Sequence, residues 1–558
     1  MAQPSREKNG KAPQGSDECT KVIEITEDEA GFLFGWDGYA LMRIERASEC
    51  KVEVLEDELA LELRGTQRAV QLAEKCARCV LDSRSAGEGI EEPDPSDESC
   101  TILLVPVEAV GVVTGRDHAC IRQIEDEECV IMAFAGPLED EEETDQLVIH
   151  GARRGRRAAQ LTVMAMVENK IPEYYAQAYR ESGETYEDEK DAGGDWGTAT
   201  RELGPAELSY VIGKGGATRR KINKASECIV VYVNNVVFMS GTQKQRERAQ
   251  DYLEWLVSQV DQPRKPPAAI KTEGRKDCTV IEIPSDCVGY VTGKKREALG
   301  SIEETWGVLA FFLNVRHEED EEDGNDPVQL AIFGSLRNRC GAELTVKSAV
   351  ETKAQGHFTQ GATESRNPAK GFARDRLILE DEDVAYALGR GGSTRKKLAT
   401  ASNAIFQFIG PVAVIAGTLE ERQRGREYLK FLLAQRDGRV VVDTAGRDDV
   451  AVVDLPRHCA NALASNGGAE LREIEQETGT FVFMAETPSG EEKVMIFGHD
   501  AGSTGSGTGR TKAHSLVKSA MRGARHGGDG WHSHGGKSGK GAKGGKGDKS
   551  GKGDKGGK

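Results

Sequence analysis

The stretch YVIGKGGATRRKI at residues 210–222 decides the fold of this chain, and YALGRGGSTRKKL repeats its pattern at residues 386–398. Each stretch joins an apolar helical turn to a glycine-rich loop and then to a basic helical segment. The loop occurs six times, as GWDG from Gly35, GRDH from Gly115, GKGG from Gly213, GKKR from Gly293, GRGG from Gly389 and SNGG from Ser465. A motif that recurs in a fixed frame indicates one small domain copied several times.

The residues around each loop predict the order strand, helix, loop, helix, strand, strand, helix. In the fourth copy the short β-branched or aromatic runs TVIEIP, GVLAFFL and VQLAIF are typical of strands. CVGYVT and EALGSIEET are the helices on either side of the loop, and residues 336–350 form the last helix.

Six units follow from this pattern, and we number them 1 to 6. Their expected ranges are 20–84, 99–170, 198–260, 277–353, 374–437 and 447–525. The expected linkers are 85–98, 171–197, 261–276 and 354–373. The first three of these linkers are polar and rich in Gly or Pro, so we expect them to lack ordered structure. Residues 1–19 and the Gly/Lys-rich tail 526–558 are expected to be disordered.

A longer period divides the units into two classes. The first loop residue moves from 35 to 213 to 389 in units 1, 3 and 5, and from 115 to 293 to 465 in units 2, 4 and 6. The residues after the loop differ between the two series, for example NKASECIVVYV in unit 3 and IEETWGVLAFF in unit 4. The chain is therefore expected to consist of three blocks of two units each, with different roles for odd and even units.

Composition limits the possible classes of protein. The chain has 558 residues and a formal net charge of −18, so it is not coated in positive charge, although a local basic stripe can still bind nucleic acid. The start of the chain lacks an apolar signal region and no stretch approaches 18 apolar residues, which predicts an intracellular protein without a membrane span. The 12 cysteines recur at repeat positions, which favours buried thiols over a metal site.

This pattern resembles the K-homology (KH) family of type I, and the chain as a whole is similar to the multi-KH arrays of vigilin-type proteins. The resemblance is strong for units 3 and 5 and covers most of residues 20–525 by internal alignment. It implies an α+β fold, a tandem array of six type I KH-like domains of order β-α-α-β-β-α. Each would have a three-stranded antiparallel sheet packed on three helices, with units 2 and 4 degenerate.

The resemblance implies single-stranded RNA binding through the loops of units 3 and 5. Glycines let a sugar-phosphate backbone approach closely, and the following helix N-terminus favours anions. Bases would lie beside residues 217–224 and 228–233 of unit 3, and beside 393–400 and 404–409 of unit 5. The expected RNA-binding residues are Gly213, Lys214, Gly215, Gly216, Arg219, Arg220, Lys221, Gly389, Arg390, Gly391, Gly392, Arg395, Lys396 and Lys397.

Two of these residues depart from the family pattern, which has an apolar residue six positions after the first loop glycine. Arg219 and Arg395 stand there in units 3 and 5. Either the arginine points along the neighbouring strand or the helix is rotated, and the sequence leaves both open.

Units 2 and 4 are expected not to bind RNA. His118 and Arg296 replace the closing glycine of their loops. Acidic residues follow, at 125–128 in unit 2 and at 303–304 in unit 4, and they would repel phosphate.

Other functions remain alternatives. A protein-interaction scaffold, with partners held by the even units, and single-stranded DNA binding are both compatible with the sequence. An enzyme is not expected, because the loops match neither GxxxxGK[ST] nor GxGxxG and no catalytic cluster recurs. We expect no cofactor, no metal and no membrane partner.

Overall fold

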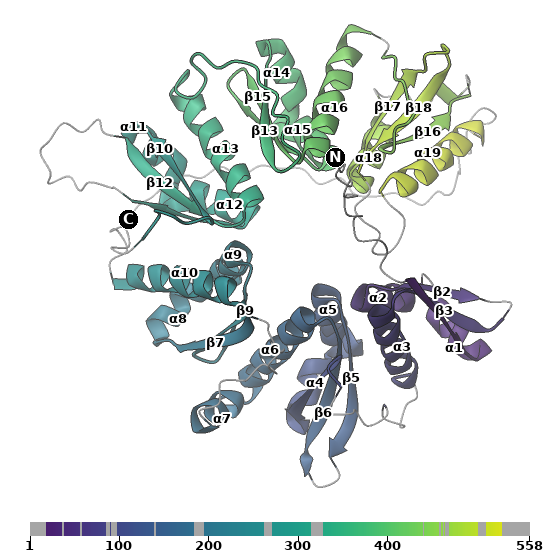
Figure 1. Cartoon of the computed structure of the whole chain (residues 1–558), viewed down its shortest axis with the longest axis vertical. Helices are drawn as coiled ribbons and strands as arrows, with labels where there is room; N and C mark the ends of the chain where they lie inside the picture. Colours follow the sequence, from purple (N-terminus) through teal and green to yellow (C-terminus); the bar gives the residue numbers. More distant parts are fainter. Residues whose placement is uncertain are drawn as a thin grey trace, which may run out of the picture.

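The computed structural model describes residues 18–526 apart from short segments, namely 36–37, 56–57, 85–89, 91–96, 139–140, 183–194, 262–269, 314–326, 439, 457–458, 461–462, 464–467 and 500–508. The described chain forms six three-stranded antiparallel sheets, one in each unit. In every sheet the third strand of the unit lies between the first and the second, as in the order β1-β3-β2. The expected α+β array of six similar folds is confirmed. Figure 1 shows the units following one another around an arc.

The element bounds follow the repeat. Unit 1 consists of β1 (Glu18–Glu24), α1 (Glu27–Phe34), α2 (Tyr39–Ser48), β2 (Lys51–Leu55), β3 (Ala60–Thr66) and α3 (Gln67–Asp82). Unit 3 consists of β7 (Trp196–Glu202), α8 (Pro205–Ile212), the 3-10 turn η2 (Lys214–Gly216), α9 (Ala217–Ser226), β8 (Ile229–Val233), β9 (Val236–Thr242) and α10 (Gln243–Asp261). Unit 5 consists of β13 (Ala373–Ile378), α14 (Asp381–Leu388), η4 (Arg390–Gly392), α15 (Ser393–Ser402), β14 (Ile405–Ile409), β15 (Val412–Gly417) and α16 (Leu419–Asp437).

The even units have the same order. Unit 2 consists of β4 (Cys100–Pro106), α4 (Val107–Thr114), η1 (Arg116–His118), α5 (Ala119–Glu128), β5 (Val130–Leu138), β6 (Glu141–Gly151), α6 (Arg153–Lys170) and an added helix, α7 (Tyr174–Ser182). Unit 4 consists of β10 (Cys278–Ile283), α11 (Ser285–Thr292), η3 (Lys294–Arg296), α12 (Glu297–Trp306), β11 (Leu309–Phe312), β12 (Val328–Phe333) and α13 (Leu336–Lys353). Unit 6 includes β16 (Val450–Asp454), α18 (Ala469–Thr478), β17 (Phe481–Glu486), β18 (Glu492–Phe497) and α19 (Gly509–His526).

The strand and helix positions predicted for unit 4 are confirmed, but the expectation of disorder in the second linker is wrong for α7. Burial of Tyr175 and Ala176 holds this helix against unit 2. The Tyr175 hydroxyl donates to the carbonyl of Leu104 (2.6 Å), and its backbone N–H donates to the Glu168 carboxylate (2.9 Å). The apolar surface of a few aromatic residues is thus enough to order a segment whose average composition is polar. The termini 1–19 and 526–558 were expected to be disordered, but residues 18–19 begin β1 and residue 526 ends α19, and residues 1–17 and 527–558 lie outside the described residues.

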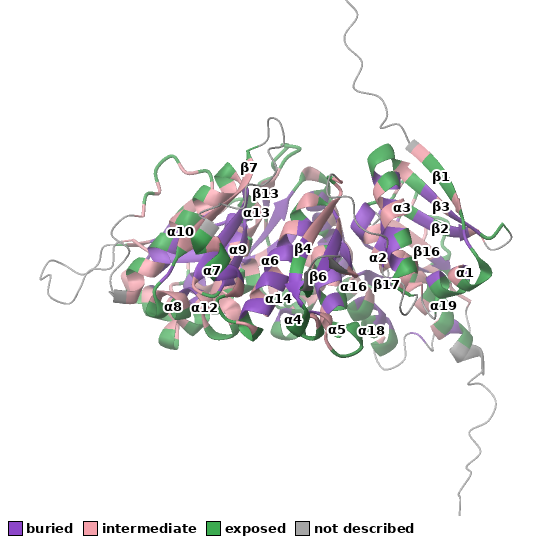
Figure 2. Ribbon diagram, turned by 90° about the horizontal axis from the view of Figure 1, so that it is seen from below, coloured by how far each residue is buried: buried purple, intermediate pink, exposed green. Residues whose placement is uncertain are grey.

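The cores of neighbouring units are continuous. In unit 1 the strand β2 alternates between exposed and buried residues, with Lys51 and Glu53 exposed, so its sheet has one polar face. In unit 3 all five residues of β8 are buried, because α6 of unit 2 packs on the face that would otherwise be free. The same arrangement places α3 on the sheet of unit 2 and α13 on the sheet of unit 5. Figure 2 shows the buried residues running along the strands of the successive sheets.

The contacts between units 3 and 4 and between units 5 and 6 are rich in aromatic side chains. Trp255 of α10 lies 6.0 Å from Phe311 and 4.8 Å from Phe333 of unit 4, measured between ring centroids. Tyr428 of α16 lies 5.2 Å from Phe497 of unit 6. Large aromatic rings supply much apolar area at little entropic cost, so these contacts stabilise the second and third blocks strongly.

A buried arginine in the last helix ties that helix to the start of the first strand of the same unit. In unit 5 the Arg422 side chain is fully buried, and its Nη1 donates to the carbonyl of Asn367 and to Oδ1 of Asp375, both at 2.7 Å. Its Nη2 donates to the carbonyl of Ala369 (2.6 Å). Arg156 and Arg339 make equivalent bonds in units 2 and 4.

One histidine makes the stability of unit 2 depend on pH. Burial lowers the pKa of His150 in β6 to about 4, with Lys75 and Arg156 also disfavouring the cation and Asp97 favouring it. A folded-state pKa below the unfolded value gives stability that is present above the unfolded pKa and is lost as pH falls toward 4. We expect a loss of up to about 3 kcal/mol over this range. The thermal midpoint of wild type should therefore fall more steeply than that of His150→Asn between pH 7 and pH 4, and parallel curves would contradict this.

Candidate nucleic-acid interface

The first loop glycine is required by the fold. Gly213 and Gly389 end the helices α8 and α14 with φ of 68° each, in the left-handed region. A Cβ on either would overlap the side chain of the threonine five residues later, Thr218 or Thr394. This glycine lets the chain turn sharply from one helix into the next.

The following glycines have open space around them instead. No atom lies within 4 Å of the position that a Cβ on Gly215 or Gly391 would take. A Cβ on Gly216 would meet the Arg220 guanidinium at 3.5 Å, and one on Gly392 would meet that of Arg395 at 3.7 Å. Gly215 and Gly391 are exposed, whereas Gly216 is half-buried and Gly392 is buried, so a ligand can approach the backbone at the third residue of each loop.

The loops of units 2 and 4 adopt the same backbone shape without these glycines. Asp117 and Lys295 have φ of 52° and 53°, and the closing residues His118 and Arg296 have φ of 60° and 63°. The values at Gly215 and Gly216 are 58° and 74°. The loop conformation is therefore common to both classes of unit. Glycine differs only in leaving open space beside the loop backbone.

The expected basic residues fall into three groups: four exposed residues, two half-buried arginines, and two lysines, Lys221 and Lys397, that pair with the next unit. Lys214, Arg220, Arg390 and Lys396 are exposed at or beside the loops. Arg220 Nη1 donates to the carbonyl of Gly215 (2.7 Å) and so lies back over its own loop. Arg219 and Arg395 are half-buried.

The contacts of Arg395 decide, for unit 5, between an arginine that points along the neighbouring strand and a rotated helix. Its Nη1 donates to the carbonyl of Phe406 in β14 (2.9 Å), while Leu398 three residues later is fully buried. The helix therefore keeps its apolar face on the core, and the arginine points along the strand. Burial lowers the pKa of Arg395.

Lys221 and Lys397 do not face the loop opening. The Lys221 ammonium lies 2.8 Å from the Glu303 carboxylate of unit 4, and that of Lys397 lies 3.0 Å from Glu475 of unit 6. In the first block Arg43 occupies the same position and lies 2.5 Å from Glu125. Each of these cations stands eight residues after the first loop residue of an odd unit. A recurring ion pair therefore joins the two units of every block.

This pairing corrects the expected role of two acidic residues. Glu125 and Glu303 were expected to repel phosphate, but both are buried in the contact between units. Their carboxylates, and that of Glu475, each accept the backbone N–H seven residues later, at Met132, Ala310 and Val482, at 2.9 Å. Burial raises the pKa of Glu125 and of Glu475. These carboxylates hold units together.

Exposed aromatic residues flank the loops, and the sequence analysis missed them. Tyr210, Tyr290 and Tyr386 are between 40% and 51% exposed. Each stands three residues before the first loop glycine, as does Phe32 in unit 1. The recurrence of an aromatic residue at this position was a signal available in the sequence.

A groove adjoins the open side of the unit 5 loop. It has a volume of about 480 Å³ and lies between α15 of unit 5 and α18 of unit 6. Gly391, Lys396 and Arg472 are among its lining residues. The loop and the neighbouring even unit thus share one concave surface.

The remaining expectations concern thiols, metals and membranes. Cys76 and Cys79 are buried, which raises the pKa of Cys79 to about 12, whereas Cys129 is exposed, contrary to the expectation for the recurring cysteines. Among the described residues, no group of three His, Cys, Asp or Glu side chains could hold a metal ion. A search of the described helices finds none with the length and apolar character needed to cross a bilayer. The loop residues 36–37 of unit 1 and 465–467 of unit 6 lie outside the described chain.

Comparison with known proteins agrees with this architecture. The model of the KH domain family matches residues 205–254, which include the GKGG loop. Far upstream element-binding protein 2 of Homo sapiens is 23% identical over 329 residues, 52% of this chain and 45% of that protein. Far upstream element-binding protein 1 of Rattus norvegicus is 24% identical over 120 residues, 21% of this chain and 19% of that one. The chain spans less than half the length of these relatives.

Solved structures cover parts of the array. A chain of the a/eIF2alpha-aDim2p-rRNA complex from Pyrococcus horikoshii OT3 is 17% identical, covers 29% of this chain and 86% of its own length, and has a TM-score of 0.17. A structure described as KH domains is 11% identical over 62% of this chain and 92% of its own, with a TM-score of 0.11. The match to the KH domain model covers unit 3, and the other five units share the sheet topology of that unit.

Proposed function

We propose that the chain binds single-stranded RNA through the GKGG loop of unit 3 and the GRGG loop of unit 5. The observation that carries the proposal is the open space beside Gly215 and Gly391 in loops that also expose Lys214 and Arg390. A sugar-phosphate backbone can lie against bare peptide there. In units 2 and 4 Asp117 and Lys295 stand at the position of Gly215 and Gly391, and His118 and Arg296 follow at the closing position.

Phosphate contacts would come from the loop and from the exposed side chains next to it. The N-termini of α9 and α15 follow directly, and the dipole of a helix favours an anion at this end. The exposed side chains of Arg220 and Lys396 add positive charge beside the loops. Lys221 and Lys397 serve the RNA indirectly in this proposal, since they fix the even unit against the binding helix.

Bases would lie on the other side of the loop. The exposed rings of Tyr210 and Tyr386 stand three residues before the loop glycine and offer a face for stacking. Arg219 and Arg395 would line the path of the bases along β8 and β14, where Arg395 already bonds to the strand carbonyl of Phe406.

Relatives support nucleic acid as the class of ligand, because the two similar proteins named above are named for binding an upstream element. Single-stranded DNA is therefore the alternative ligand that the test must separate. The 2′-hydroxyl is the group that lets a protein distinguish the two.

The test compares 12-nucleotide RNA and DNA of the same random sequence with the full chain by fluorescence anisotropy at several salt concentrations. We expect affinity for RNA that falls with rising salt, because phosphate contacts release counterions. Ultraviolet crosslinking followed by mass spectrometry should give RNA-bearing peptides that contain residues 213–216 and 389–392. Crosslinks confined to residues 527–558 would contradict the proposal, and tighter binding of DNA would replace RNA as the ligand.

A further inference from the structure

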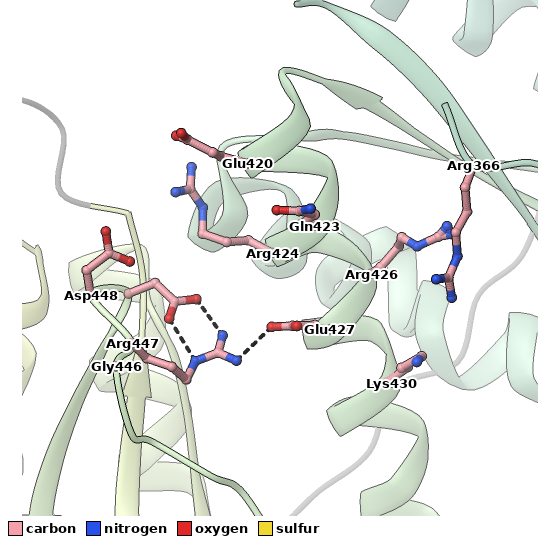
Figure 3. Close-up of a pocket in the computed structure, with 11 residues that line it drawn as sticks. Arg366, Glu420, Gln423, Arg424, Arg426, Glu427, Lys430, Gly446, Arg447 and Asp448 are labelled. Carbon is pink, nitrogen blue, oxygen red and sulfur yellow. Dashed lines mark hydrogen bonds and ion pairs between the residues drawn. The ribbon is translucent and has the colours of Figure 1, made fainter. Parts of the chain in front are cut away.

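A second pocket lies in unit 5, away from the GRGG loop. It has a volume of about 590 Å³ and is formed by α16, by Arg366 from the segment before β13, and by the turn 446–449 that leads into unit 6 (Figure 3). The loop precedes the N-terminus of α15, whereas Arg424 at the pocket contacts the carbonyl of Ser402 at the C-terminus of that helix (3.4 Å). Ten helical residues span about 15 Å, so the pocket and the loop are separate sites.

The charges around this pocket are sorted into two ends. At one end Arg447 binds the carboxylates of Glu427 (2.7 Å) and Asp449 (2.9 and 2.7 Å), so one cation offsets part of the charge of two acids, and Glu420 and Asp448 line the pocket as well. At the other end the side chains of Arg366, Arg426 and Lys430 lie close together (Figure 3). We call these three residues the cationic wall.

Arg426 is the informative member of the cationic wall. It is only 8% exposed, and its Nη1 finds no hydrogen-bond acceptor among the described residues. The nearest carboxylate oxygen is Oδ2 of Asp375, at 3.5 Å, and the other oxygen of Asp375 already accepts from Arg422 at 2.7 Å. Two buried guanidinium groups therefore share one carboxylate. A buried charge is costly unless it is paired, so the site has an unmet demand for an anion.

The other units show that the fold does not require this charge. The residue at the position of Arg426 is Glu74 in unit 1, Gln160 in unit 2, Gln250 in unit 3 and Glu343 in unit 4. Lys430 corresponds to Glu254 in unit 3. The neighbouring arrangement is nevertheless retained in unit 3, where Arg275 binds Asp251 and Asp277. The added charge of unit 5 therefore lies at Arg426, since the position of Lys430 is also basic in units 1 and 4, as Arg78 and Lys347.

We propose that the cationic wall binds a phosphate group, at a site distinct from the KH loops. Two guanidinium groups and an ammonium group converge on a polar pocket large enough for a polyphosphate. Guanidinium groups bind phosphate oxygens with paired, charge-assisted hydrogen bonds. The bound phosphate would give the guanidinium group of Arg426, which shares Asp375 with Arg422, a further counter-charge.

Titration calorimetry of the full chain with tripolyphosphate tests the site. Arg366→Gln with Lys430→Glu removes the two exposed cations and should weaken binding by about tenfold or more, the equivalent of one lost charge-assisted contact. The matched control is Lys170→Gln with Lys244→Glu, which changes the net charge equally at exposed positions outside the pocket. It should leave affinity within about twofold, as expected for screened surface charges.

Arg426→Gln copies unit 3 and gives an independent variant. It should lose tripolyphosphate binding without losing thermal stability, because it removes an incompletely paired buried charge. Absence of saturable binding by wild type, or equal affinity of wild type and the Arg366/Lys430 variant, would overturn the proposal whether or not Arg426→Gln folds.

Measurements of RNA affinity distinguish the two possible sources of the phosphate, an RNA strand and a free polyphosphate. If the group belongs to a strand that continues beyond the loop, the Arg366/Lys430 variant will bind a 30-nucleotide RNA more weakly than the Lys170/Lys244 control does. If it belongs to a free polyphosphate, RNA affinity will be equal in the two variants. Tripolyphosphate binding should persist when the loops of units 3 and 5 are inactivated, so failure of the RNA proposal leaves this one testable.

Discussion

Replacing Lys214 and Gly215 in unit 3 and Arg390 and Gly391 in unit 5 by aspartate should lower the affinity of the full chain for single-stranded RNA by at least about 100-fold. Each loop loses a cation and gains two anions at the place where the phosphates are proposed to lie. A charge-assisted hydrogen bond contributes about 1.5–3 kcal/mol. Loss of one such contact at each of two loops is enough for this change, because about 1.4 kcal/mol corresponds to a factor of ten.

The substitutions should leave the fold intact. Asp117 already occupies the position of Gly215 in the loop of unit 2, with φ of 52° and ψ of 36°, against 58° and 28° at Gly215. A side chain at Gly215 or at Gly391 meets no atom within 4 Å. Circular dichroism and thermal midpoints should therefore stay close to those of wild type while anisotropy reports the loss of RNA.

Unit 4 provides the matched control. Lys294→Asp with Lys295→Asn changes the net charge by the same three units as the paired substitution in unit 3, in a loop of the same backbone shape. We expect less than about a threefold change in RNA affinity, which is the scale of a screened surface charge. Equal losses from the unit 3 variant and the unit 4 control would contradict the division of labour between odd and even units.

Glu303→Ala should destabilise the block formed by units 3 and 4 by about 3–5 kcal/mol, the usual cost of removing one partner from a buried ion pair. The Glu303 side chain is only 2% exposed and accepts from Lys221 Nζ (2.8 Å), Arg296 Nη2 (2.8 Å) and the backbone N–H of Ala310 (2.9 Å). All three donors would lose this acceptor. Urea unfolding, followed by the fluorescence of Trp255 and Trp306 beside this contact, measures the effect.

Glu304, the next residue in the sequence, provides the matched control for Glu303→Ala. Glu304 is 62% exposed and lies 3.6 Å from Arg220, so its ion pair is screened by water. Exposed pairs contribute about 0–1 kcal/mol, and Glu304→Ala should be nearly neutral. The loss of stability caused by Glu303→Gln should lie between those of Glu303→Ala and Glu304→Ala, because the amide oxygen still accepts from Ala310 while the charge is lost. Similar unfolding midpoints for Glu303→Ala and Glu304→Ala would show that the buried pair does not hold the units together.

The fold could be predicted from the sequence because each unit carries local signals of every element. The glycine loop marks the turn between two helices, and short β-branched runs such as IVVYV mark strands. The contacts between units could not be predicted in the same way. The acids at Glu125 and Glu303 and the cations at Arg43 and Lys221 are visible in the sequence, but their pairing depends on how one unit docks on the next.

The candidate site was predicted in part for the same reason. The loop glycines and the exposed cations are local features, and the structure places them together. Whether Lys397 reaches solvent or a neighbouring unit depends on a residue 78 positions later in the chain, Glu475. The contrast between KVEVL in β2 and IVVYV in β8 did contain a clue, since only the second lacks a polar face.

The last helix of each unit covers the sheet of the unit that follows it in the sequence. The order in which the sheets are covered is therefore the order in which the units are synthesised. Translation releases unit 1 before units 2 to 6, and its sheet has a polar outer face that tolerates water. Every later sheet leaves the ribosome next to a finished helix that is ready to shield it. Since protein domains generally fold one after another from the N-terminus during translation, the nascent chain can be assembled with little apolar surface left exposed at any stage.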